Sequence, residues 1–167
     1  MNHFVYTMPM GRLTIAADDL GITEIHFGDI TLDMNYQPSA LTNQAATQLQ
    51  EYFTGNRTEF SVPIHASGTD FQLLVWNAIS HIPYGQTCSY ADIAQAIGKP
   101  TSYRAVGNAA NKNPIPIIIP CHRVIKSQGV LGEYAFGNKI KEYLLELEAG
   151  KKTRCPLRWA HDRTKGR

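Results

Sequence analysis

Hydrophobic and polar residues alternate over three short stretches at the start of the chain. These stretches are His3–Met8, Arg12–Ala17 and Ile22–Phe27, and turn-forming residues separate them. Alternation with a period of two is typical of β-strands that bury one face. Because the connecting turns are short, the pattern predicts an antiparallel meander.

Helical periodicity replaces this alternation further along the chain. Ala40–Phe53 carries apolar residues at helical spacing, and a Thr-Gly-Asn turn ends the pattern. The stretch Pro63–Gly68 then has the composition of a linker. We therefore predict a strand-and-helix domain over residues 1–66 and a second domain over residues 67–150.

The second domain is predicted to be mainly helical. One helix opens near Asp70, and Ser89 with Asp92 three residues later gives a second helix a capping-box-like start. A third helix runs to about Asn111, and a fourth is expected over Asn138–Ala149. The second and third helices are short, and a tight turn containing glycine joins them. They form a helix-turn-helix candidate.

The second helix of this candidate is predicted to have two different faces. Its outer face is small and polar with one arginine, which would let the backbone approach a shallow groove closely. An exposed helix face without a partner gives the same pattern, so this face alone does not establish nucleic-acid binding. We assign Tyr103, Val106 and Ala110 to the packing face, and Arg104, Gly107, Asn108 and Asn111 to the outer face.

Cys121 and His122 directly follow the apolar run Ile115–Ile119. A thiol reacts as its thiolate, and a nearby imidazole can take its proton. A cysteine after an apolar run is also typical of a buried core residue. Adjacent side chains diverge on a regular helix or strand. The two residues could therefore cooperate only at an irregular turn or through a bridging water.

Glu148 is a candidate partner for that imidazole. Ile140, Leu144 and Leu147 form an apolar stripe on the last predicted helix, and Glu148 lies at the edge of the stripe. The other glutamates of this helix fall on the opposite side. A carboxylate drawn inward here could orient an imidazole, as the third member of a catalytic triad does.

Composition narrows the classes of function only slightly. Hydrophobic residues make up 43% of the chain and charged residues 18%. The formal net charge is only +2, so the overall charge does not by itself indicate a nucleic-acid partner. Residues 151–167 form a basic tail, either a solvated terminus or an arm near a phosphate backbone.

The three cysteines lack zinc-like spacing, so we expect no metal. No apolar run approaches membrane-spanning length and no signal pattern opens the chain, which predicts a cytoplasmic protein.

Several motifs together resemble the O6-alkylguanine-DNA alkyltransferases (methylated-DNA–protein-cysteine methyltransferases). The resemblance runs from about Phe71 to Glu148, and its most specific part is the Pro-Cys-His-Arg block after Asn-Pro and an apolar run. It implies an α+β fold, with a ribonuclease H-like N-terminal domain of antiparallel sheet and helix and a helical C-terminal domain. The motifs are Ile82–Gly85, Ser89–Ala94, Arg104–Gly107, Asn113-Pro114, Ile118–Val124, Gly132–Tyr134 and Leu144–Glu148.

The resemblance also implies an activity. Members of the family carry out direct-reversal DNA repair, in which a cysteine irreversibly accepts the alkyl group, usually methyl, from O6 of guanine in double-stranded DNA. The helix-turn-helix enters the minor groove and the damaged base is flipped out of the stack. For this chain we expect no cofactor, no metal and no membrane, and a monomer that is associated with the nucleoid when bound to DNA. Activity on O4-alkylthymine is left open.

Roles for individual residues follow from the same resemblance. Cys121 would be the acceptor, His122 its base, and Glu148 would orient the imidazole. Asn113 would hold the turn that carries the cysteine, and Tyr90 would protonate the leaving guanine. Further DNA contacts are assigned to Arg104, which fills the gap in the base stack, and to Tyr90, Ala105, Gly107, Asn108 and Arg123. The substrate pocket is assigned to Tyr134, Ala135 (whose N–H donates to O6), Phe136 and Lys141.

Three other interpretations remain open at this stage. A non-catalytic damage sensor of the alkyltransferase-like type would share the helix-turn-helix but lack the reactive cysteine. A thiol hydrolase would use Cys121, His122 and Glu148 on a small molecule, and would leave Arg104 without a purpose. A plain helix-turn-helix module would make the thiol inert and would prefer particular DNA sequences. Alkyl transfer from DNA to Cys121 separates all three from the alkyltransferase.

Overall fold

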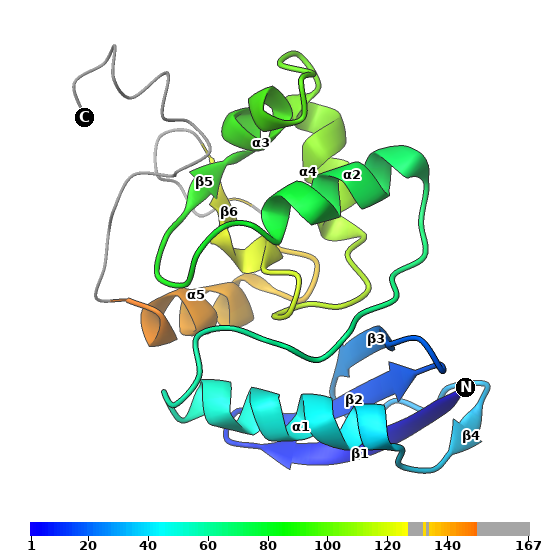
Figure 1. Cartoon of the computed structure of the whole chain (residues 1–167). Coiled ribbons are helices and arrows are strands. Elements are labelled where there is room, and N and C mark those ends of the chain that lie inside the picture. Colours follow the sequence, from blue (N-terminus) through cyan, green and yellow to red (C-terminus); the bar gives the residue numbers. More distant parts are fainter. Residues whose placement is uncertain (127–131, 133, 150–167) are drawn as a thin grey trace. The chain divides into compact units, whose positions relative to one another are not determined.

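The structure, a computed structural model, describes residues 1–126, 132 and 134–149 (Figure 1). The basic tail predicted over residues 151–167 lies outside the described residues. The chain divides into two compact units. The first contains Met1–Ser67 and Pro114–Pro116, and the second contains Gly68–Asn113 and the described residues between Ile117 and Ala149.

A four-stranded mixed sheet forms the core of the N-terminal unit (Figure 1). Its order is β3-β2-β1-β4. The strands β1, β2 and β3 pair antiparallel, which confirms the predicted meander. The short β4 pairs parallel with β1 and was not predicted, because two exposed residues leave no alternation to recognise. The strands are β1 (Asn2–Met8), β2 (Gly11–Ala17), β3 (Ile22–Phe27) and β4 (Asn35–Tyr36).

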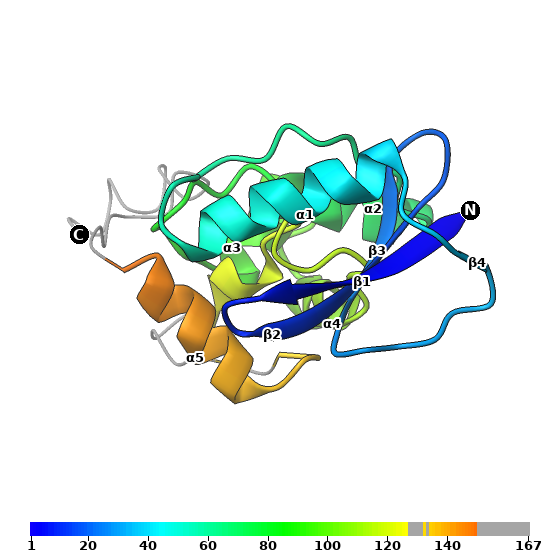
Figure 2. The ribbon, with the colours of Figure 1, turned by 90° about the horizontal axis from the view of Figure 1, so that it is seen from below.

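Helix α1 (Ala40–Phe53) packs along the sheet of this unit, as Figure 2 shows. Its N-terminus has a capping box, in which the Ser39 side chain accepts from the Thr42 N–H and the Thr42 hydroxyl accepts from the Ser39 N–H. The apolar stripe read from the sequence is the buried face, with Leu49 and Tyr52 fully enclosed. The helix has the predicted bounds because both its stripe and its cap are local.

The predicted linker is in part a structured edge of the N-terminal unit. Ile64 pairs with Ile22 at the start of β3, and the Ile22 N–H donates to the Pro63 carbonyl at 2.9 Å. Gly21 permits this close approach, since a Cβ there would lie 2.8 Å from the Pro63 oxygen. Pro114 also belongs to this unit, because its carbonyl accepts from the Ile25 N–H at 2.9 Å.

Short helices and one pair of very short strands make up the C-terminal unit (Figure 1). Capping boxes start the first two helices: the one at Ser89 was predicted, and a second one lies at Thr69. Trp76 anchors two helices to each other by donating its indole N–H to the Ala109 carbonyl at 2.9 Å. The elements are α2 (Asp70–Ile79), β5 (Cys88–Ser89), α3 (Tyr90–Ala96), α4 (Tyr103–Asn111), the 3₁₀ helix η1 (Cys121–Arg123), β6 (Val124–Ile125) and α5 (Asn138–Leu147).

The helix-turn-helix candidate corresponds to α3 and α4, which pack against each other. One assignment on α4 is wrong, because Tyr103 is 48% exposed at the first position of the helix. Ala109, which we had assigned to neither face, is buried beside Val106 and Ala110. Among the residues that the structure describes, we find no helix with the length and apolar character needed to cross a bilayer.

Candidate active site

Cys121 lies at an irregular turn, the kind of geometry that cooperation with its neighbour requires. It opens the one-turn 3₁₀ helix η1, which leads directly into β6. The approach to this turn is strained, because the β-branched Ile117 has φ of 74°, in the left-handed region. Such strain costs roughly 1–3 kcal/mol and persists only where surrounding contacts enforce it. Ile117 and Cys121 are both almost fully buried, so packing fixes the turn.

The Cys121 thiol is held by Asn113. The Asn113 side-chain amide donates to the Cys121 sulfur at 3.0 Å and to the Ile119 carbonyl at 2.8 Å. Burial raises the pKa of Cys121 to about 12, although the Asn113 hydrogen bond and the charge of Lys141 oppose the rise. The resting form at neutral pH is therefore the thiol. Reaction requires a base that removes the proton as the sulfur attacks.

His122, the next residue along the chain, contacts a carboxylate. Its Nε2 lies 2.7 Å from Glu148 Oε2, and both residues are buried. Burial opposes the charge on Glu148, but hydrogen bonds and charges from His122 and Arg123 hold the pKa of Glu148 well below its usual range. Burial lowers the pKa of His122, with Glu148 opposing. The imidazole is therefore neutral, with Nε2–H donating to the carboxylate and a lone pair on Nδ1.

The Nδ1 atom of His122 is itself buried and makes no hydrogen bond to any described residue. A buried imidazole nitrogen of this kind normally has a partner. A neutral nitrogen with an uncommitted lone pair is suited to accept a proton.

Arg123 lies elsewhere than we predicted. Its side chain is 5% exposed, so it is not available to a DNA phosphate. The guanidinium grips Glu148 with two bonds, from Nε to Oε1 at 2.8 Å and from Nη2 to Oε2 at 3.0 Å. Its Nη1 donates to the Ile82 carbonyl at 2.7 Å, and its Cζ lies 5.8 Å from the centre of the Tyr84 ring. We therefore correct its assignment to DNA binding, because its donors contact Glu148 and the Ile82 carbonyl instead of a phosphate.

Lys141 is a second buried cation of this unit. Its side chain is fully buried, and its ammonium group donates to the Val124 carbonyl at 2.7 Å. The same group lies 6.0 Å from the centre of the Tyr90 ring and 5.9 Å from that of Tyr134. Burial lowers the pKa of Lys141 to about 8, with Cys121 opposing. A cation here favours negative charge on the sulfur.

Aromatic side chains surround the space beside these charges. Tyr134 is buried, and its hydroxyl has no hydrogen-bond partner among the described residues. Phe136 contacts Tyr134 edge to face, with ring centres 5.1 Å apart. Tyr90 begins α3 and approaches two glycines closely: a Cβ on Gly132 would lie 3.2 Å from its hydroxyl, and one on Gly107 3.8 Å from its ring. The Tyr90 ring thus connects the helix-turn-helix to the site.

The outer face of α4 is free for a partner. Arg104, Ala105 and Asn108 are exposed, and Gly107 is half-buried beneath the Tyr90 ring. Ala135 is also exposed. The structure thus brings together Cys121, His122, Glu148, Asn113, Lys141, Tyr90 and Tyr134, with the exposed α4 residues forming a separate surface.

Sequence reasoning missed the residues around Glu148. Tyr84 donates to the Leu147 carbonyl at 3.3 Å, and the Gly85 N–H lies 3.4 Å from Glu148 Oε1. Both belong to the Ile-Pro-Tyr-Gly motif, which the sequence shows only as a helix-breaking turn. The neighbouring Arg123 gives no sign of burial in the sequence, because arginines are usually exposed.

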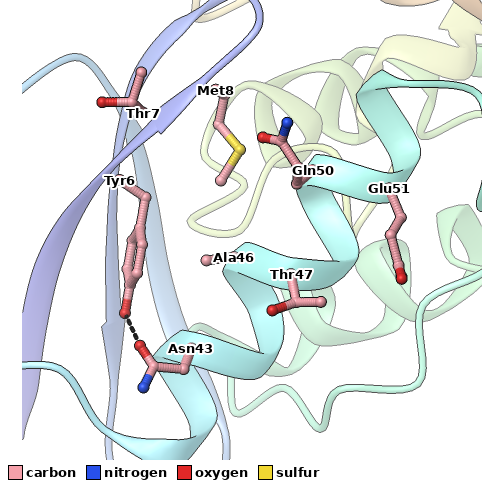
Figure 3. Close-up of a pocket in the computed structure, with 8 residues that line it drawn as sticks. All are labelled: Tyr6, Thr7, Met8, Asn43, Ala46, Thr47, Gln50 and Glu51. Carbon is pink, nitrogen blue, oxygen red and sulfur yellow. Dashed lines mark hydrogen bonds between the residues drawn. The ribbon is translucent and has the colours of Figure 1, made fainter.

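No group of three or more His, Cys, Asp or Glu side chains able to hold a metal occurs among the described residues. A pocket of about 420 Å³ lies in the N-terminal unit between β1 and α1 (Figure 3). In this pocket the Tyr6 hydroxyl donates to Asn43 Oδ1 at 2.7 Å. None of the predicted site residues lines it, and it carries no reactive side chain. Its lining residues are Tyr6, Thr7, Met8, Asn43, Ala46, Thr47, Gln50 and Glu51.

Comparison with known families agrees with the geometry of the site. Residues 70–150 match the family model described as the DNA binding domain of 6-O-methylguanine DNA methyltransferase, and residues 1–66 match the ribonuclease-like domain of the same protein. The chain belongs to the 6-O-methylguanine DNA methyltransferase family. Together the two matches account for nearly all the described residues.

Curated members of this methyltransferase family are similar over most of their length. The methylated-DNA–protein-cysteine methyltransferase of Methanosarcina barkeri is 44% identical over 153 residues, covering 89% of this chain and 97% of the relative. The constitutive enzyme of Bacillus subtilis is 41% identical, covering 89% and 96%.

A solved structure from the family agrees with the fold. The Mycobacterium tuberculosis protein in complex with DNA superposes with a TM-score of 0.82 at 43% identity, covering 89% of this chain and 92% of that one. The α+β fold predicted from the sequence is thus confirmed, with the N-terminal sheet mixed rather than purely antiparallel.

Proposed function

We propose that Cys121 is the alkyl acceptor of this protein and that His122, Glu148 and Asn113 activate it. As a member of the methyltransferase family, the protein repairs DNA by moving an alkyl group from O6 of guanine to a cysteine. The observation that carries the assignment is a pair of buried contacts at adjacent residues. The Asn113 amide donates to the free Cys121 thiol, and His122 contacts Glu148. No cofactor enters this proposal.

The first step is removal of the thiol proton. The proton leaves Cys121 Sγ and reaches His122 Nδ1 through a bridging water, because side chains at adjacent positions do not face each other directly. Two features support this route: the lone pair on Nδ1, and the carboxylate of Glu148 that fixes the ring from the other side. Glu148 stabilises the imidazolium that forms without taking the proton.

The second step is a single displacement. The sulfur forms a bond to the alkyl carbon as the bond from that carbon to O6 breaks, and the electron pair passes to the guanine. Tyr90 donates a proton to the leaving base, and the Ala135 N–H donates to O6. The product at Cys121 is a thioether, which no side chain of this site can cleave. Each molecule therefore acts once.

The substrate reaches the site only if the base leaves the duplex. We assign the outer face of α4 to the minor groove, because its small exposed residues allow close approach and Arg104 can fill the vacated position in the stack. Repair must work in any sequence, so contacts to phosphates and shape suit it better than contacts to base edges. One chain supplies every residue named here, which suits a monomer, and a DNA substrate suits a nucleoid location in the cytoplasm.

Mass spectrometry of the intact protein and its peptides tests the assignment directly. The protein is incubated with duplex DNA that carries one O6-methylguanine, and unmodified duplex serves as the control. We expect a stoichiometric gain of one methyl mass on the peptide containing Cys121. Tight binding of the lesion without any mass gain would favour the sensor, and neither binding nor mass gain would favour the small-molecule thiol hydrolase.

Phe136 is expected to limit the size of the O6 group. Its ring contacts Tyr134 edge to face, with the ring centres 5.1 Å apart. We expect Phe136→Gly to raise the rate with O6-benzylguanine while changing the rate with O6-methylguanine much less, because only the larger group needs the space. Single-turnover rates with the two substrates measure this. An unchanged benzyl rate would contradict the role.

Gly132→Ala is expected to slow the reaction by displacing Tyr90. Gly132 has φ of 73°, and an added Cβ would lie 3.2 Å from the Tyr90 hydroxyl. The left-handed conformation alone costs an alanine roughly 1 kcal/mol. Single-turnover methyl transfer should fall about tenfold or more, since small misplacements of a reacting group are costly. Gly98→Ala, with similarly positive φ but open space around its Cβ, is the matched control for backbone strain.

A further inference from the structure

Arg123 has no place in the proposed chemistry so far, yet it makes more contacts to the catalytic carboxylate than His122 does. Two of its nitrogens donate to the two Glu148 oxygens at 2.8 and 3.0 Å, while His122 contacts one oxygen at 2.7 Å. The third nitrogen is held by the Ile82 carbonyl at 2.7 Å. The guanidinium group is therefore held by the Glu148 carboxylate on one side and by the Ile82 carbonyl on the other. Bidentate pairs between arginine and a carboxylate have a specific geometry.

A carboxylate beside an imidazole has two effects that conflict here. It orients the ring, which helps catalysis, but its negative charge also favours the protonated imidazole. A protonated His122 cannot accept the Cys121 proton. A buried carboxylate acts strongly, because the interior screens charge poorly. The site therefore needs the orienting contact without the full electrostatic effect of the charge.

We propose that Arg123 is a positioning residue that keeps Glu148 ionised and offsets its charge at His122, so that the imidazole is oriented yet stays neutral. The geometry supports this, because the guanidinium covers both oxygens of the carboxylate that His122 contacts. The inference rests on the proposed function, since it assumes that His122 is the base.

The charged groups around His122 agree with this role. Burial is the main cause that lowers the pKa of His122, Glu148 raises it, and Arg123 and Lys141 lower it. The charged groups that act on the ring from η1 and α5 are therefore Arg123, Lys141 and Glu148. The titratable residue of the neighbouring α2, Asp70, is exposed in its first turn. Arg123 is the cation that touches the carboxylate itself.

The pH dependence of alkyl transfer tests the proposal. The rate falls on the acid side as His122 becomes protonated, so the position of this fall reports the pKa of the imidazole. In Arg123→Met the uncompensated Glu148 charge raises that pKa, and the fall moves to higher pH. The rate at neutral pH drops as a result. In Arg123→Met/Glu148→Gln both charges are gone, and the fall moves back to lower pH.

Controls separate charge from folding. Arg123→Met leaves a buried charge unpaired and so could unfold the protein, whereas the double variant removes the pair together and Arg123→Lys retains the charge. We expect Arg123→Lys to keep the acid-side fall near the wild-type position while losing part of the rate. Arg57→Met, which breaks the half-buried pair with Glu51, should change neither.

Single-turnover methyl transfer to Cys121 is followed by mass spectrometry across the pH range, and the His122 ring is titrated by NMR. A higher His122 pKa in Arg123→Met, restored in the double variant, supports the proposal. If only the single variant fails to fold, the double variant and Arg123→Lys decide. A rate lowered equally at all pH values, with an unmoved His122 titration, overturns it. Wild-type protein that never gains a methyl on Cys121 would instead overturn the proposed function.

Discussion

Cys121→Ser is expected to abolish methyl transfer while leaving recognition of the lesion intact. A hydroxyl is a far weaker nucleophile than a thiol at this pH, and His122 alone does not compensate for that difference. The substitution is nearly the same size, and the Asn113 amide that now donates to the sulfur at 3.0 Å can donate to the serine oxygen. The fold and the DNA surface should therefore be preserved.

Intact-mass measurement after exposure to methylated duplex checks this result, and binding of the same duplex is measured by fluorescence anisotropy. Thermal unfolding shows whether the variant is folded. Wild-type protein treated in the same way, and unmodified duplex, serve as the controls. Methyl transfer to another residue in Cys121→Ser would contradict the assignment of the acceptor.

His122→Gln is expected to slow alkyl transfer by about 10²–10⁴-fold at neutral pH, the range typical of a lost general base. Gln can still donate to Glu148, so that the carboxylate keeps a partner in place of the 2.7 Å contact. Because the pKa of Cys121 is raised to about 12, little thiolate exists without a base.

The pH profile of His122→Gln carries the sharper test. Below its pKa, the thiolate fraction of Cys121 rises about tenfold with each pH unit. The rate of the variant should follow that rise into the alkaline range, whereas the wild-type rate should not. Single-turnover rates at a series of pH values measure this. A variant profile parallel to that of the wild type would mean that His122 does not take the proton.

Much of the fold was predictable because its signals are local. The strands β1 to β3 follow from alternation, α1 and α2 from an apolar stripe, and α3 from its apolar residues together with the capping residue Ser89. β4 and the edge formed by Ile64 were not predictable, because both depend on pairing with distant segments. Tyr103 was misassigned because helical periodicity does not show whether the first turn of a helix is covered by other elements.

The site divides in the same way. Cys121, His122 and Glu148 could be proposed from residue type and position, since each has a chemical reason to stand there. The placement of Arg123 could not, because the sequence shows only a cation beside the catalytic pair and not the buried carboxylate that it neutralises. The contacts of Tyr84 and Gly85 to the end of α5 join positions 63 residues apart, and local patterns do not report such contacts.

The burial of Cys121 also affects how well its thiol resists oxidation before the protein meets a lesion. Its thiol is 3% exposed and its pKa is raised to about 12, so an idle molecule presents almost no thiolate to peroxides or other soft electrophiles. Because such a protein reacts only once, it has no catalytic cycle that would restore an oxidised cysteine. With Cys121 as the proposed acceptor, a thiol that stays protonated until the damaged base arrives keeps each molecule reduced and able to react.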